Sequence, residues 1–290
     1  MNTLSTCVLP KVGVGLRHAH FRDALSMPAS IDFVEVHAEN FFADGGVLHQ
    51  LLKDISDVYP VSLHATAMGL GSAAGIPEFY IRQMQSLNFL INPFLISDHA
   101  CFAWGKIGDK VIHAGDLLPI PYNRESLNVM EGNVDRVQQM LGRQILVENI
   151  SAYIQMSGST FPESEFLVSL CERTGCGLLV DLNNILVNER NAGNNDVVCA
   201  AKDWLNNLPK GVVGEFHLAG NSISTTNDLV VDDHSQPVSD ECWELYEFAL
   251  KRFGPVPTLI EWDNQLPDWP QLIDQAGKAK NIAKGVLQNV

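Results

Sequence analysis

The segment VGEFHLAG, residues 213–220, carries Glu215 and His217 inside an otherwise apolar run. Such a run is typical of a buried β-strand, in which side chains two positions apart point to the same side. The carboxylate and the imidazole therefore face one place together. A buried carboxylate is costly unless it is paired or binds a cation. This strand therefore predicts a functional site rather than plain core.

Histidines, carboxylates and amides also stand at the carboxyl ends of other apolar runs. They are Glu35, His37, Glu39, His64, Asp98, His99, Glu148, Asn149, Asp181, Asn184 and Glu261, with Asp232, Asp233 and His234 in a later loop. We expect no lysine or arginine among them. Buried carboxylates that meet without a counter-charge repel one another, and divalent or trivalent cations remove that repulsion. About nine such groups could hold two or three metal ions with open positions for substrate or water.

Each of these residues has an ordinary explanation when it is taken singly. A lone histidine at a strand end is usually a satisfied core or rim residue, and a lone carboxylate often caps the next helix. The metal interpretation is favoured because all the ordinary explanations would have to hold together at one end of the fold. A further group is expected to orient the ligands by hydrogen bonds or to contact substrate: His37, Glu39, Asn40, Asp98, His113 and Asn149.

Eight short aliphatic runs recur along the chain and are almost continuously apolar, as in parallel strands covered on both faces. They cover residues 12–16, 33–38, 61–66, 94–100, 144–150, 177–184, 213–220 and 258–264. Amphipathic helical patterns lie between them. Eight strands alternating with helices in 290 residues fit an α/β fold of the closed (β/α)₈ type, a TIM barrel, better than an open sheet. Catalytic groups of such barrels lie at the carboxyl ends of the strands.

The helical patterns make more detailed predictions. Thr160 and Glu163 form a plausible capping box for a helix that stops at Gly175, and Ser239 could cap another that ends at Gly254. One apolar stripe of the helix over 47–59 is expected to contain Val47, Leu51, Ile55 and Val58.

We expect residues 1–290 to form a single domain with an insertion at about 101–123. The insertion contains the alternating sequence WGKIGDKVIH, which predicts a small hairpin around Gly108 and Asp109. Because it follows a strand end, the insertion should lie at the mouth of the barrel.

Composition excludes several classes of protein. The formal net charge is −15 and no Lys/Arg cluster is present, which argues against nucleic acid as a substrate. No run of 18 or more apolar residues suggests a membrane span, and the first residues do not resemble a signal peptide. The six cysteines, which include Cys7, contain no CxxC pair. We expect reduced thiols in a cytoplasmic protein, with Cys171 and Cys176 as packing residues.

The chain also resembles known families. The order His64, His99, Glu148, Asp181-x-x-Asn184, His217, Asp232-x-His234 and Glu261 is similar to the metal-ligand order of xylose isomerase-like barrels, including the endonuclease IV type. The sequence segments around these residues are more similar to one branch, the DUF692 multinuclear non-haem iron proteins. Segments of this kind are EVHAENFF, SLHATAMGLGS, SDHACFAW, DLLPIPY, LVENISAY, LLVDLNN, GEFHLAG, DDHSQPV and LIEWDN. The likeness extends from about residue 12 to 265.

The resemblance implies a TIM barrel with two or three iron ions, Fe(II) or Fe(III), and dioxygen as co-substrate. Members modify cysteine residues in ribosomally synthesised precursor peptides (RiPPs), many with a partner protein that captures the leader peptide. The implied ligands are His64, His99, Glu148, Asp181, Asn184, His217, Asp232, His234 and Glu261. Either Asp233 or Glu215 is expected to act as the base, and the sequence does not choose between them.

Three other functions stay open. One is a sugar isomerase or epimerase that needs two divalent ions and no oxygen. Another is an accessory subunit that binds metal and holds a partner. An endonuclease IV-like phosphodiesterase is disfavoured by the acidic surface and by Asn184, which stands where that family has histidine.

Overall fold

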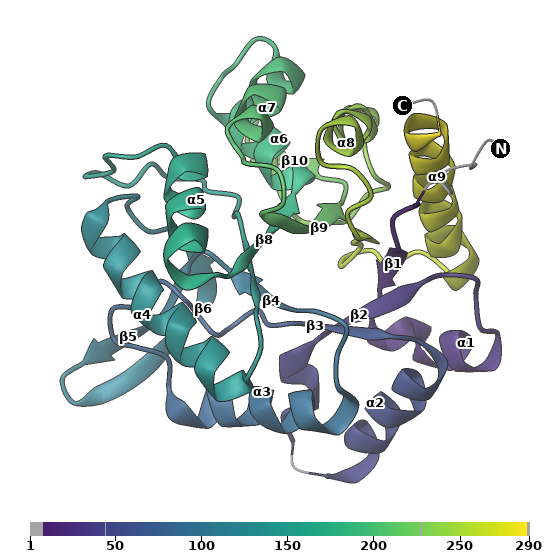
Figure 1. Ribbon diagram of the computed structural model, residues 1–290, viewed down its shortest axis with the longest axis horizontal. Coiled ribbons are helices and arrows are strands. Elements are labelled where there is room, and N and C mark those ends of the chain that lie inside the picture. The colour runs from purple at the N-terminus through teal and green to yellow at the C-terminus, as the bar shows by residue number, and fades with distance from the viewer. Residues whose placement is uncertain (1–7, 44, 227, 289–290) are drawn as a thin grey trace, which may run out of the picture.

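The barrel is built from eight parallel strands that close on themselves (Figure 1). The structure is a computed structural model that describes residues 8–43, 45–226 and 228–288. The order around the ring follows the chain, and the last strand pairs with the first. This confirms the predicted TIM barrel. The strands are β1 (Val12–Gly15), β2 (Phe33–His37), β3 (Val61–His64), β4 (Ile96–His99), β7 (Leu146–Glu148), β8 (Gly177–Asp181), β9 (Val213–Leu218) and β12 (Thr258–Ile260).

Helices surround the ring of strands (Figure 1). Barrel-strand residues are almost all buried, because helices cover the outer face while side chains fill the interior. The helices are α1 (Phe21–Ser26), α2 (Gly46–Val58), α3 (Glu78–Ile91), α4 (Arg124–Leu141), α5 (Glu163–Thr174), α6 (Leu182–Asn191), α7 (Val197–Asn206), α8 (Asp240–Phe253) and α9 (Trp269–Leu287), with short 3₁₀ turns η1 (His18–His20) and η2 (Ala38–Phe41).

The predicted helix stops at Gly175 and Gly254 and the predicted cap at Ser239 are confirmed, whereas the predicted N-terminal capping box is wrong. The Ser239 side chain caps α8, which ends at Gly254. The capping box predicted for α5 is wrong, because Pro162 occupies the N-cap position. The Glu163 carboxylate instead accepts hydrogen bonds from the Tyr122 hydroxyl (2.8 Å) and the Trp204 indole (3.2 Å). Hydrogen bonds from these two distant residues have replaced the predicted hydrogen bonds of the capping box.

The buried face of α2 also differs from the predicted stripe. Leu52 and Ile55 are fully buried, whereas Val47 is 83% exposed and Val58 is 42% exposed. The helical period is right, but the face that meets the barrel is rotated toward Leu52. Tertiary packing selects one apolar face of a helix that carries apolar residues on more than one.

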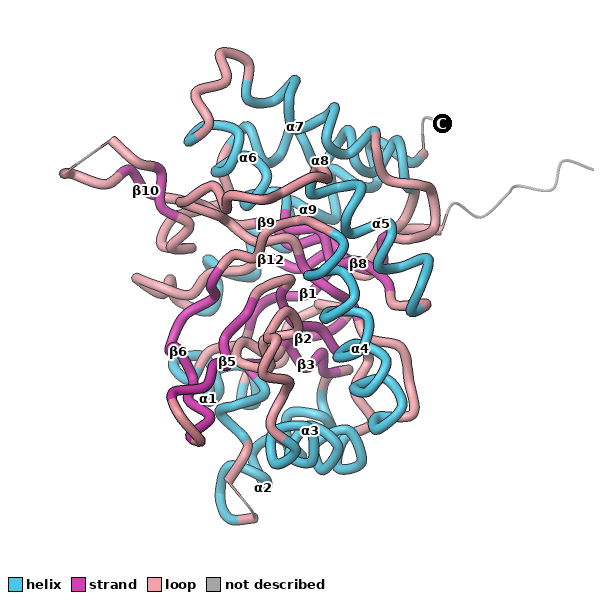
Figure 2. Tube along the Cα trace, turned by 90° about the vertical axis from the view of Figure 1, so that its left-hand side faces the viewer, coloured by secondary structure: helices cyan, strands magenta, loops and turns pink. Residues whose placement is uncertain are grey.

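Two hairpins leave the carboxyl ends of barrel strands and lie on the same side of the molecule (Figure 2). β5 (Phe102–Ile107) and β6 (Lys110–Leu118) pair antiparallel across the predicted turn, where Gly108 has a φ of 58°. β10 (Ser222–Ile223) and β11 (Val230–Val231) form the second, shorter hairpin. Both therefore flank the end of the barrel at which strand-end side chains gather.

Two general expectations concern membranes and thiols. Across the described ranges, no helix has the length and apolar character needed to span a bilayer. The five cysteines within those ranges are free, and the Sγ atoms of Cys171 and Cys176 are 3.7 Å apart in the core. Cys7 lies outside the described residues.

Candidate metal centre

The last residues of three adjacent strands bring two histidines and a carboxylate together. His64 ends β3, His99 ends β4 and Glu148 ends β7. The Nε2 atoms of the two histidines lie 3.5 Å and 3.4 Å from Glu148 Oε2. His64 Nδ1 lies 2.8 Å from the Ser97 hydroxyl, so that its Nε2 faces the carboxylate. Parallel pairing places consecutive strand ends at one edge, which makes this cluster a direct result of topology.

A second group lies across the barrel mouth, where Glu261 follows β12. Its Oε2 atom is 2.9 Å from His217 Nδ1 and 3.5 Å from His234 Nδ1. Asp181 ends β8 and contributes a fully buried carboxylate to the same region. Asn184 lies in the first turn of α6, where its backbone N–H donates to Asp181 Oδ1 at 2.6 Å.

The loop after β11 supplies Asp232 and His234. His234 Nε2 lies 2.7 Å from Asp232 Oδ1. The Asp232 carboxylate also accepts hydrogen bonds from the Ser151 hydroxyl (3.0 Å) and the Asn183 amide (2.7 Å). His234 has a φ of 46°, a left-handed conformation that is costly for a residue with a side chain. Such strain is concentrated at functional sites.

Unpaired donor atoms test whether these residues fit a metal. Buried polar atoms normally have a hydrogen-bond partner, yet several here have none: Glu148 Oε2, Asp181 Oδ2, Asn184 Oδ1 and His217 Nε2. Groups that meet the geometry of a cation site include His64 with His99 and Glu148, and Asp181 with His234 and Glu261. A mixed set of imidazole nitrogens and carboxylate oxygens suits first-row transition ions. The donor set therefore fits a cluster of such ions.

A cavity of 250 Å³ opens at this mouth. Most of the sequence-predicted ligands line it, namely His64, His99, Glu148, Asn184, Asp232, His234 and Glu261. Asp181 and His217 are outside that lining, yet each belongs to a candidate metal cluster with a residue that lines it. The structure thus brings all nine predicted ligands together, while their coordination of metal stays a prediction.

Burial and neighbouring charges shift the pKa values of these groups. Although burial opposes it, the nearby carboxylates raise the pKa of His217 and His234 well above the usual range, so these two imidazoles would lose a proton on binding a metal. Burial raises the pKa of Glu148 well above its usual range, and burial with the nearby Asp232 carboxylate raises the pKa of Asp181 to about 7. Burial lowers the pKa of His64, and it lowers the pKa of His99 to about 4. Both imidazoles are therefore neutral at pH 7 and have a free lone pair for a metal. Metal binding would release the protons that the buried carboxyl groups retain.

The expectation that no arginine lies among these groups is wrong. Arg17 follows β1 and is buried, with its Nη2 atom 3.2 Å from Glu261 Oε1 and its Nε atom 2.5 Å from Asp263 Oδ1. One oxygen of Glu261 is thereby held by the guanidinium while the other faces the histidines. Asp263 was also missed, although it stands two residues after Glu261. The positions of both at strand ends are the signal that could have revealed them.

Two carboxyl groups lie deeper in the barrel. Glu35 on β2 and Glu215 on β9 are fully buried. Glu35 Oε1 is 3.5 Å from His217 Nε2, and its Oε2 accepts from the Ser62 hydroxyl at 3.1 Å. Neither oxygen of Glu215 has a partner, and burial together with Glu35 raises its pKa well above the usual range.

The other candidate base is at the rim. Asp233 lines the mouth cavity, and its Oδ2 atom accepts hydrogen bonds from the hydroxyls of Ser222 (2.6 Å) and Ser235 (2.9 Å). Glu215 does not line that cavity. The two predicted bases are therefore separated by depth, with only Asp233 in reach of a molecule in the mouth.

Three predicted partners of the ligands make well-defined hydrogen bonds. Asn149 joins β7 to β8, because its amide donates to Asp181 O at 3.0 Å and its oxygen accepts from Asp181 N at 2.9 Å. Glu39 accepts hydrogen bonds from the backbone of the loop after His64, at residues 66 and 67. Asp98 accepts from a third backbone N–H of that loop, at residue 68. These contacts hold the segments on which ligands stand.

The remaining predicted residues lie in different places. His37 lines the mouth cavity, with its ring 6.1 Å from that of His64. Asn40 is exposed on η2, and His113 packs its ring at 4.7 Å from Trp104 on the hairpin. Neither lines the mouth cavity, where Asp116 and Leu117 represent β6 instead. Contact of Asn40 or His113 with substrate stays a prediction.

Comparison with known proteins agrees with this geometry. The family described as "RiPP precursor modification enzyme MbnB/TglH/ChrH" matches residues 11–284. The chain belongs to this family. A UPF0276 protein of Chromobacterium violaceum is 41% identical and the match covers 97% of this chain and 98% of that protein; one from Rhizorhabdus wittichii is 40% identical, with 95% and 96% covered.

Solved structures of similar shape share only the fold with this family member. Endonuclease IV from Thermus thermophilus superposes with a TM-score of 0.56 at 14% identity, covering 97% of this chain and all of that one. A D-psicose 3-epimerase from Clostridium cellulolyticum gives 0.57 at 9% identity, covering 96% and 99%. The predicted xylose isomerase-like type of barrel is thus confirmed, as is the predicted family.

Proposed function

We propose that this protein is a multinuclear iron enzyme that uses dioxygen to modify a cysteine residue of a ribosomally synthesised precursor peptide. Membership in a family of precursor-modifying enzymes supports the substrate class. The observation that carries the proposal is the set of buried, unpaired nitrogen and oxygen atoms that converge on the mouth cavity. Bound cations would satisfy these atoms together.

The iron ligands in this proposal are the nine residues brought together at the mouth. They would be His64, His99, Glu148, Asp181, Asn184, His217, Asp232, His234 and Glu261. When bound, two or three iron ions would supply the redox chemistry that dioxygen needs and Lewis acidity for a substrate thiolate. These ligands come from five barrel strands, the first turn of α6, the loop after β11 and the residue after β12, so the fold would position them before substrate arrives.

The chain's own residues would prepare the substrate. Asp233 is the base that we propose for the cysteine thiol, because a base must reach the proton that it removes and only Asp233 of the two candidates lines the cavity. Glu215 would lie beneath the ligands, out of reach of the thiol. Arg17 would balance the charge of Glu261 and Asp263.

A second protein would present the peptide, as the family resemblance implies. The two hairpins lie on the same side of the molecule (Figure 2), and a partner bound to them would hold the leader while the cysteine enters the mouth cavity. No nucleic acid is required, since the chain carries a formal charge of −15 and would repel a phosphate backbone.

The test is metal content and oxygen use in matched variants. His64→Ala and Glu261→Ala should lose bound iron and oxygen-dependent mass change of a cysteine peptide together. His49→Ala is the control, because His49 stands on α2, lies 3.0 Å from Phe41 O through its Nε2 atom and does not line the mouth cavity. Full iron and turnover in both mouth variants would refute the ligand assignment. Anaerobic turnover of a sugar with manganese would support the epimerase alternative instead.

A further inference from the structure

A second cavity adjoins the mouth and is larger than it. We name it the side pocket; its volume is 530 Å³, against 250 Å³ for the mouth cavity. This volume falls in the range of sites that bind small molecules or side chains. Its lining comes from the segment after β6, the loop after β7, the end of α6 and the residue before β11, and it includes Ile120, Tyr153, Ile154, Met156, Glu189 and Leu229.

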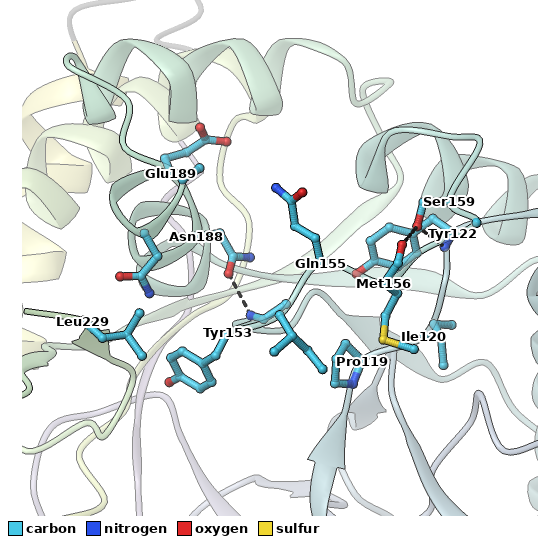
Figure 3. A pocket seen from close by; sticks show the side chains of 15 residues that line it. Pro119, Ile120, Tyr122, Tyr153, Gln155, Met156, Ser159, Asn188, Glu189 and Leu229 are labelled. Atoms are coloured by element: carbon cyan, nitrogen blue, oxygen red, sulfur yellow. Dashed lines mark hydrogen bonds between the residues drawn. The ribbon is translucent and has the colours of Figure 1, made fainter. Parts of the chain in front are cut away.

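Apolar side chains line much of the side pocket, beside the polar side chains of Gln155, Ser159 and Asn188. Tyr153 and Leu229 lie on one side of it and Ile120 with Met156 on the other, as Figure 3 shows. Tyr153 remains 45% exposed and Ile154 remains 61% exposed. Clustered exposed apolar side chains around a hollow are typical of interaction sites.

One residue joins this pocket to the metal centre. Tyr153 lines both cavities. Its hydroxyl accepts a hydrogen bond from the backbone N–H of Asp232 at 2.9 Å, so the wall of the side pocket also holds a proposed iron ligand. Asn188 anchors the same segment to α6, because it accepts from Ala152 N and donates to Ile150 O, each at 2.8 Å (Figure 3 marks the first).

Charge limits what the side pocket can receive. Within the described ranges, its lining contains one charged side chain, the carboxylate of Glu189. The neighbouring mouth adds further carboxylates at Asp116, Asp233 and Asp263. An acidic occupant would be repelled, whereas a neutral apolar side chain would bury against the walls.

We infer that the side pocket binds an uncharged apolar side chain of the precursor peptide, close in sequence to the modified cysteine. This inference rests on the proposed function. An extended peptide advances about 3.3 Å per residue, and the two cavities share the Tyr153 side chain as a wall. A cysteine in the mouth would therefore place a residue one or two positions away in the side pocket. The pocket would thus select the sequence around the cysteine.

The test measures binding separately from reaction. Two fluorescent peptides with the cores Leu-Leu-Cys-Leu-Leu and Ser-Ser-Cys-Ser-Ser are titrated anaerobically with the full-length, iron-loaded protein, and anisotropy is recorded. Burial of one leucine side chain is expected to give the first peptide about tenfold higher affinity. In Ile154→Asp this preference should fall to about twofold, because a carboxylate then borders the pocket.

The control is Phe89→Asp, which makes the same kind of change elsewhere. Phe89 is 92% exposed near the end of α3, which leads into the start of β4 and so lies at the opposite end of the barrel from the mouth. It should keep the full preference for leucine. Both variants replace exposed side chains, so thermal unfolding should match that of the parent protein.

Equal affinity for the two peptides, or a leucine preference that survives Ile154→Asp, would overturn the side pocket as a peptide subsite. A leucine preference that survives Ile154→Asp would show that the leucine binds elsewhere and that the side pocket either contacts the partner protein or binds no ligand. The same samples exposed to air report the reaction by mass spectrometry. Leucine-selective binding without any oxygen-dependent mass change would keep the side pocket and refute the proposed reaction. Equal oxidation of both peptides with the same KM would keep the reaction and refute the pocket.

Discussion

Asp181→Asn gives the sharpest test of the electrostatics at the mouth. The pKa of Asp181 is raised to about 7 by burial and by the Asp232 carboxylate. A carboxyl group must lose its proton to bind a metal, so this group weakens binding as the pH falls. With a pKa of about 7, protonation of Asp181 weakens metal binding by a factor of about 1.1 at pH 8, about 2 at pH 7 and about 11 at pH 6. Asp181 alone should therefore weaken metal binding about tenfold between pH 8 and pH 6.

The variant should bind metal more weakly at every pH, but with a shallower pH dependence that lacks this tenfold factor. Asparagine retains the oxygen that accepts from Asn184 N, so the start of α6 is preserved. The His99 imidazole, with a pKa of about 4, loses no further proton over this range and does not contribute to the slope.

The assay is anaerobic titration of the metal-free protein with Fe(II) at pH 6, 7 and 8, with a competing chelator to set the free metal. Asp196→Asn is the matched control, because Asp196 also caps a helix, accepting from Cys199 N at 3.0 Å, but is exposed and does not line the mouth cavity. It should match the parent at all three pH values. An unchanged slope in Asp181→Asn would show that this carboxyl group does not control proton release.

The same pKa affects stability. A carboxyl group whose folded pKa is raised favours the folded state below its unfolded pKa, near 3.9, and that contribution is lost as the pH rises toward 7. The metal-free protein should thus unfold at a lower temperature at pH 7.5 than at pH 5. Bound metal should reduce or reverse the difference, because it replaces the proton.

Three further variants test other contacts. Arg17→Met removes the counter-charge of the buried Glu261 and the partly buried Asp263 and should lower the free energy of unfolding by about 3–5 kcal/mol in urea melts of the metal-free protein; a loss below 1 kcal/mol would contradict the ion pairs. Ser97→Ala frees His64 Nδ1 and should weaken iron affinity by about 10- to 100-fold in chelator competition, with an unchanged affinity as the contrary result. Gly220→Ala places a Cβ atom 2.4 Å from Gln236 O and should shift the loop that bears two ligands, so iron content should drop even where circular dichroism shows a folded barrel.

Much of the site follows from the sequence because parallel strands end at one edge. Once eight apolar runs alternate with helices, the residues at their ends must meet, whatever the details of packing. His64, His99 and Glu148 needed no further information to be placed together. The resemblance of these sequence segments to a known family added the expectation of iron, dioxygen and a peptide substrate, which no pattern of polar residues could specify.

Predictions from local sequence patterns were wrong where contacts with distant segments replaced local ones. Glu163 fits a capping box by spacing, yet the Tyr122 hydroxyl and the Trp204 indole reach it from other elements. The α2 stripe has the right period on the wrong face, since the sequence does not say which way a helix rotates against a barrel. Both errors arise because packing energy exceeds the small free energies of local propensity.

The sequence by itself determined the closed barrel and the set of donors at its mouth, since these depend on the period of apolar residues and on strand order. Only the tertiary structure decided which atoms of those donors face each other. It brought the long Arg17 side chain across to Glu261, separated Asp233 at the rim from Glu215 below, and placed the side pocket against Tyr153. The reach and rotamer of a side chain depend on neighbours from distant segments, and those neighbours are fixed only when the ring of strands has closed.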